Sequence, residues 1–141
     1  MVKLEGLIKL HQFEVDEKRR ILAAHFLELE KLQERLRKAH EQFENEKKHS
    51  QENPELHHYI PSYMARYQRE RQVITDAMVT CEENIEEAKE HLLDAFSELK
   101  KFEMTEQERR RLADIARKVK DAKMFDDVAL DIFRRQNGEN S

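Results

Sequence analysis

Few residues of this chain have the type and spacing that catalysis or metal binding requires. Its two glycines, Gly6 and Gly138, lie far apart, so the sequence holds no glycine-rich phosphate loop. It also lacks a His-Glu-x-x-His zinc pattern and a nucleophile elbow. The adjacent histidines His57 and His58 could bind a metal only with a third ligand, and none is evident. We therefore expect a protein that is not an enzyme and that uses no metal or cofactor.

The single cysteine, Cys81, excludes an internal disulfide and a thiolate-cluster zinc site. A reactive thiolate would need nearby cations, whereas glutamates surround this position: Glu82, Glu83, Glu86 and Glu87. We expect Cys81 to fill the core as a small apolar residue.

Length and composition predict one all-α domain over residues 1–141. Charged residues make up 40% of the chain, against a usual ~25%, and the 2 glycines and 2 prolines are too few for the turns of a sheet protein. No stretch of ~18 uncharged apolar residues is present, so we expect no membrane span. The charged residues among Met1–Leu10 are unlike a secretory signal, which favours a cytoplasmic location.

Two series of residues that repeat every seven positions predict two long helices packed as a coiled coil. The first series is Ile8, Val15, Leu22, Leu29, Leu36 and Phe43. The second is Tyr67, Ile74, Cys81, Ala88, Ala95 and Phe102, with Met78, Ile85, Leu92 and Leu99 between its members. Because Pro54 and Pro61 interrupt helices, we expect helix one over about 3–50, a loop over about 51–61 and helix two over about 62–136.

Folding back at that loop gives an antiparallel hairpin in which one register suits both series. It pairs Leu36 with Met78, Leu29 with Ile85, Leu22 with Leu92, Val15 with Leu99, Ala39 with Ile74, Leu32 with Cys81, His25 with Ala88, Lys18 with Ala95, and His11 with Phe102. Residues after about Leu112 are left as an overhang of the longer second helix. Apolar residues continue there at helical spacing, and exposed apolar patches usually bind a partner. The alternatives are that this segment frays, folds back or self-associates.

Two further features stand out, one at each end of the hairpin. The stretch from Arg109 to Lys123 holds seven basic and two acidic residues, which favours an acidic partner, a nucleic acid or a membrane surface, or is a solvated face. At the turn lies an aromatic cluster that is either a cap or an interface, made of Phe43, Tyr59, Tyr63 and Tyr67 with Ile60 and Met64.

The stretch from Tyr59 to Gln136 resembles the flagellar export protein FliJ family, soluble components of the flagellar type III secretion apparatus. The residues that carry the resemblance are Tyr63-x-x-x-Tyr67, Glu87-Ala88-Lys89, Ala95-Phe96, Lys100-Lys101-Phe102-Glu103, Asp126-Asp127-x-Ala129 and Arg134-Arg135. The tryptophans found in some members are missing.

The resemblance implies an antiparallel coiled coil similar to the stalk of rotary ATPases. Its partners would be the hexameric export ATPase, the membrane export gate and export chaperones, with peripheral association at the inner-membrane export apparatus and no nucleic acid. The gate contact would fall on Phe43, Tyr63, Tyr67, Arg71 and Ile74. The ATPase end would fall on Leu4, Ile8, Arg109, Arg110, Arg111, Leu112, Ile115, Val119 and Phe125. The alternative function is a nucleic-acid-associated or tethering coiled-coil protein.

Overall fold

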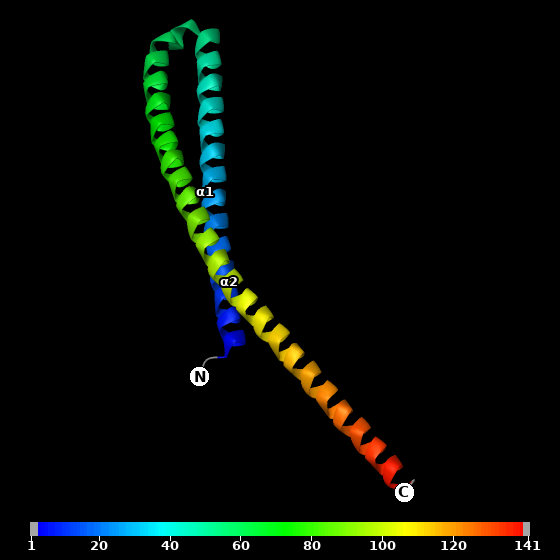
Figure 1. The fold of residues 1–141 in the computed structure, drawn as a ribbon. Coiled ribbons are helices and arrows are strands. Elements are labelled where there is room, and N and C mark those ends of the chain that lie inside the picture. Colours follow the sequence, from blue (N-terminus) through cyan, green and yellow to red (C-terminus); the bar gives the residue numbers. More distant parts are fainter. Residues whose placement is uncertain (1–2, 140–141) are drawn as a thin grey trace. The chain divides into compact units, whose positions relative to one another are not determined.

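Two long helices and a short 3-10 helix account for nearly all of residues 3–139, which are the residues that the computed structural model describes. Helix α1 spans Leu4–Glu52, the 3-10 helix η1 spans Pro54–Tyr59, and α2 spans Ile60–Glu139 (Figure 1). The predicted all-α fold with a longer second helix is therefore confirmed. The residues group into two units, one made of 12–97 and the other of 3–11 with 98–139.

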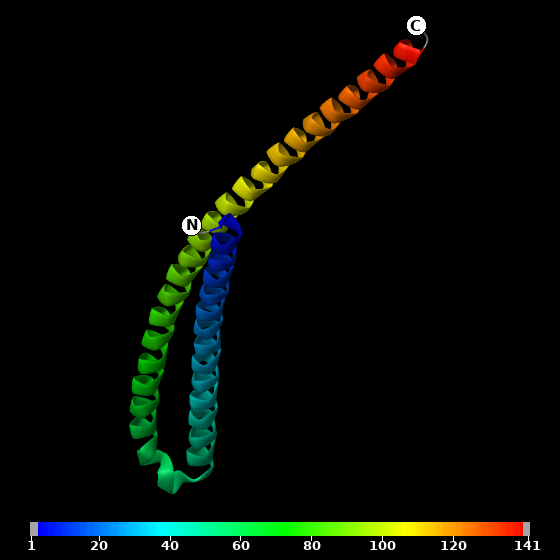
Figure 2. The same cartoon turned by 90° about the horizontal axis from the view of Figure 1, so that it is seen from below.

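In the unit of residues 12–97, α1 and α2 lie side by side and are joined through η1 (Figures 1 and 2). Buried side chains from both helices form one core, made of Leu32, Ala39, Ile74, Cys81 and Ile85, with Leu22, Leu29, Leu36, Tyr67, Ala77 and Met78 packed around it. These residues belong to the repeating series or flank it, so the seven-residue period selects the face that each helix buries.

Cys81 lies in this core, as predicted. Its Sγ donates a hydrogen bond to the backbone carbonyl of His25 at 3.2 Å. In the predicted register Cys81 faces Leu32, and both are buried in the same core, but the thiol reaches the carbonyl of His25, seven residues before Leu32 in α1. That bond satisfies the polar atom of a side chain that otherwise behaves as an apolar one.

In the unit of residues 3–11 and 98–139, the ring of His11 stacks on the ring of Phe102, with centroids 4.6 Å apart and planes 19° from parallel. This contact confirms the predicted pairing of these two residues. The buried positions of this part of α2 include Leu99 and Glu106, and every residue from 107 to 138 is exposed.

The connection between the helices is more regular than the loop predicted for residues 51–61. Helix α1 continues to Glu52, and the extended backbone of Asn53 stops it. The side-chain amide of Asn53 donates to the carbonyl of His49 at 3.0 Å, which satisfies an acceptor at the helix end. Pro54 then opens η1, because its fixed φ and missing N–H suit a first helical position.

Candidate functional site

The aromatic cluster at the turn combines a packed pair with accessible rings. Phe43 of α1 stacks on Tyr67 of α2, with centroids 4.7 Å apart and planes 7° from parallel. Nδ1 of His40 and the hydroxyl of Tyr67 share a hydrogen bond of 3.0 Å. Tyr59 and Tyr63 are exposed. The two readings of the cluster therefore apply to different residues: the Phe43–Tyr67 pair joins the helices, and Tyr59 and Tyr63 are open to a partner.

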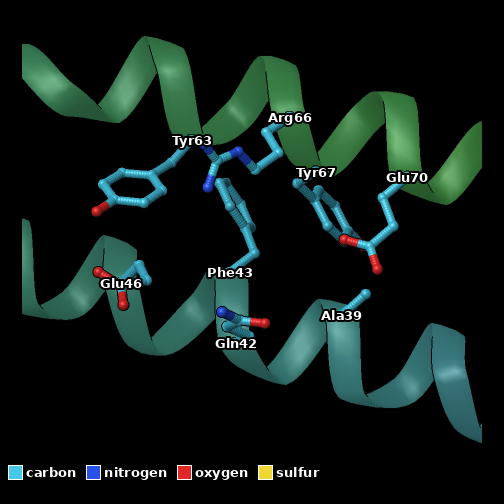
Figure 3. A pocket seen from close by; sticks show the side chains of 8 residues that line it. All are labelled: Ala39, Gln42, Phe43, Glu46, Tyr63, Arg66, Tyr67 and Glu70. Carbon is cyan, nitrogen blue, oxygen red and sulfur yellow. The ribbon is translucent and has the colours of Figure 1, made fainter.

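A cavity of about 260 Å³ opens beside this pair (Figure 3). Figure 3 shows Phe43 between Tyr63 and Tyr67, with charged groups at the rim of the cavity. Its lining residues are Ala39, Gln42, Phe43, Glu46, Tyr63, Arg66, Tyr67 and Glu70. Aromatic walls with a few polar groups are suited to holding an apolar side chain of a partner.

The residues predicted for the gate contact are not equally accessible. Tyr63 and Arg71 are exposed, and Phe43 and Tyr67 are half-buried. Ile74 is completely buried, with 0% of its surface exposed, and belongs to the core between the helices. A partner could not touch Ile74 unless the helices separated. Arg66, by contrast, is exposed and lines the cavity together with Tyr63. Arg66 lies one turn from Tyr63 in α2, and that spacing is the signal that sequence reasoning missed.

In the unit of residues 3–11 and 98–139, Leu4 and Ile8 are half-buried, whereas the predicted residues in α2 are all exposed. The exposed set consists of Arg109, Arg110, Arg111, Leu112, Ile115, Val119 and Phe125. We call residues 107–138 the C-terminal segment. It presents at least nine large apolar side chains to solvent: Leu112, Ile115, Val119, Met124, Phe125, Val128, Leu130, Ile132 and Phe133.

The apolar residues of the C-terminal segment occupy two faces of the helix. Leu112, Ile115 and Val119 follow the 3- and 4-residue steps that keep side chains on one face. Phe125 lies roughly 110° around the helix from the middle of that face, at ~100° per residue. It shares its side with Val128 and Ile132. Leu130 and Phe133, each 18 residues after Leu112 and Ile115, return to the first face. The segment therefore offers two apolar surfaces on different sides of the helix, and a partner that covered both would have to follow the helix around.

Glu106, three residues before the basic stretch, is largely buried, with only 8% of its surface exposed. Its carboxylate accepts hydrogen bonds from Arg109 at 2.8 Å and from Arg110 at 3.0 Å. These bonds, that to Arg109 first, lower the pKa of Glu106 to about 2. It lies seven residues after Leu99, so the repeat pointed to its burial, but a sequence analysis that followed only apolar residues missed it.

Intrahelical ion pairs neutralise only part of the basic stretch. Besides the two arginines on Glu106, Arg111 pairs with Glu108 at 2.6 Å and Arg117 with Asp114 at 3.4 Å. The three lysines of the stretch make no ion pair with any residue in the described range 3–139; they are Lys118, Lys120 and Lys123. Their charge is available to a partner.

Within residues 3–139, no helix is long and apolar enough to cross a membrane. The same residues bring no three His, Cys, Asp or Glu side chains together in a group that could hold a metal ion.

No protein family matches the chain, and neither a curated protein nor a solved structure matches it significantly.

Proposed function

We propose that this chain is a non-enzymatic stalk and coupling protein of the flagellar type III export apparatus. In this role it binds and stimulates the hexameric export ATPase in the cytoplasm, contacts the membrane export gate and escorts export chaperones. The observation that carries the proposal is the C-terminal segment, an exposed helix that continues α2 with apolar and basic side chains. Such a surface suits a protein partner better than solvent.

The change from partly buried to fully exposed residues along α2 supports the choice of the C-terminal segment as the ATPase contact. Up to Glu106 the helix follows the repeating pattern of burial, and from 107 to 138 every side chain is exposed. A stalk needs a stiff part that carries no partner and an end that a partner can enclose. The resemblance to the FliJ family agrees with this arrangement and supplies the ATPase ring as the partner.

The test is binding of the purified export ATPase to the full chain and to a chain that lacks residues 112–141. The deletion removes the apolar residues of the C-terminal segment and leaves the core of residues 12–97 intact. We expect the shortened chain to remain helical and to lose ATPase binding. Binding that survives the deletion would contradict the proposed contact.

The turn end supplies the second contact of the proposed function. Tyr63, with 36% of its surface exposed, and Arg66 lie on the rim of the aromatic cavity. We expect Tyr63→Ala to weaken binding to the cytoplasmic part of the gate protein without lowering the melting temperature. The matched control is Val79→Ala, which truncates another exposed side chain of α2 away from the cavity. Equal gate binding by both variants would remove Tyr63 from the contact.

A further inference from the structure

We propose that residues 109–123 of α2 lie flat on an anionic phospholipid bilayer. This stretch is a single uninterrupted helical segment of roughly 22 Å at ~1.5 Å per residue. All of its residues are exposed. The inference concerns a second binding partner for the basic stretch and stands independently of the proposed function.

The first argument is the place of the charges around the apolar face. Leu112, Ile115 and Val119 define that face. At ~100° per residue, Arg111 and Lys118 lie about 70–95° to one side of its centre. On the other side, Lys123, Arg109 and Lys120 lie about 45–110° from the centre. Basic side chains therefore border the apolar face on both sides.

The two acidic residues of the stretch are turned away from this face. Asp114 and Asp121, seven residues apart, lie about 130–155° from its centre. A helix that lies in a membrane interface buries its apolar face, and its basic side chains extend from the edges to the phosphates. Carboxylates on the far side stay in water, away from the negative lipid surface.

The second argument is that the border charges are unpaired. Lys118 lies on one edge and Lys120 and Lys123 on the other, and none of the three makes an ion pair within residues 3–139. By contrast, Asp114 forms an ion pair with Arg117, on the side away from the apolar face. The long lysine side chains can therefore reach lipid phosphates without first breaking a bond within the chain.

The continuation of α2 shows where the lipid-binding stretch ends. Beyond Lys123 the next large apolar residue, Phe125, lies on another side of the helix, and Asp126 falls on the apolar face itself. Asp127 and Asp131 follow within eight residues of Lys123. An anionic surface repels this acidic part. A duplex nucleic acid would use the charges but has no use for the apolar face between them, which is why the bilayer is the better fit.

The test is co-sedimentation of the full chain with vesicles of phosphatidylcholine alone and of phosphatidylcholine mixed with phosphatidylglycerol. We expect binding to the mixed vesicles only, and we expect added salt to weaken it because the lysine–phosphate attraction is screened. The triple variant Lys118→Gln, Lys120→Gln, Lys123→Gln should bind the mixed vesicles about a hundredfold more weakly, from roughly 1 kcal/mol per lysine at the membrane surface.

A matched control replaces three exposed lysines of α1, which are Lys31, Lys38 and Lys48, with glutamine. It should bind as the unmodified chain does. A second variant, Ile115→Ser, keeps every charge and should also weaken vesicle binding. Equal binding to neutral and anionic vesicles, no binding to either, or an undiminished triple variant would overturn the inference. A preference for duplex DNA would also overturn it. In that case the chain would bind duplex DNA, the triple variant would lose this binding, and Ile115→Ser would change neither DNA binding nor vesicle binding.

The vesicle experiment and the ATPase experiment can fail separately, because stimulation of the ATPase is measured without lipid and vesicle binding is measured without the ATPase. The same apolar face cannot contact a bilayer and an ATPase at once. If both interactions occur, anionic vesicles should therefore compete with the ATPase for the chain.

Discussion

Replacing Ile74 with alanine should destabilise the helical hairpin by about 2–3 kcal/mol, because this side chain is completely enclosed between α1 and α2. The change removes three carbon atoms, worth about 0.8 kcal/mol each on transfer out of water. The cavity left behind adds to this cost. Two effects reduce it: alanine is the better helix former, by a few tenths of a kcal/mol, and side chains of a two-helix core relax more easily than those of a deep one.

The matched control for Ile74→Ala is Val73→Ala, one residue earlier in the same helix. Val73 has 62% of its surface exposed, so its truncation should change the free energy of unfolding by less than about 0.5 kcal/mol. Both variants would be unfolded in urea and followed by far-UV circular dichroism, with the midpoint and the slope compared. Equal destabilisation by the two substitutions would refute the assignment of Ile74 to the core.

Three further predictions concern single side chains. Tyr67→Phe keeps the stack on Phe43 but loses the hydrogen bond to His40, so thermal unfolding should show a loss of about 0.5–1 kcal/mol; an unchanged melting temperature would show that this bond contributes nothing. The depressed pKa of Glu106 means that its ion pairs stabilise the folded chain fully above the ordinary glutamate pKa of 4.5 and less as the pH falls towards about 2. Acid titration of the melting temperature should therefore show a steeper fall for the unmodified chain than for Glu106→Gln, and parallel curves would contradict this. Leu29→Ala, at a half-buried position, should cost less than Ile74→Ala in the same urea experiment, and a larger cost would contradict the graded burial.

The seven-residue repeats were sufficient to predict two helices, their order and the face that each buries. Ile74, Cys81 and Ile85 all lie in the core because a regular helix carries its periodic apolar positions to one side. The details of the turn could not be derived in this way. The 3-10 helix after Asn53 depends on backbone geometry and on a side-chain bond to His49, neither of which has a periodic signature.

The sequence predicted where along the chain the candidate surfaces lie, but it was less successful in predicting which of their side chains are exposed. Tyr63 was identified from its residue type. That Tyr63 is exposed while Phe43 and Tyr67 stack between the helices depends on which rings α1 covers, and the sequence does not show this. Ile74 was placed on a partner surface, although its position in the repeat already favoured the core. For the C-terminal segment, exposure followed from the register, whereas the division of its apolar residues between two sides of the helix emerges only when each residue is placed around the helix.

The central claim is that the exposed apolar side chains of the C-terminal segment contact the export ATPase. The most direct test is the rate of ATP hydrolysis by the purified ATPase with increasing amounts of the full chain. One variant carries Ile115→Asp and Phe125→Asp, one substitution on each apolar face, and the matched control carries Val73→Asp and Val79→Asp at exposed positions elsewhere in α2. We predict that the unmodified chain and the control stimulate hydrolysis equally and that the first variant does not. Undiminished stimulation by the Ile115 and Phe125 variant, or none by the unmodified chain, would contradict the claim.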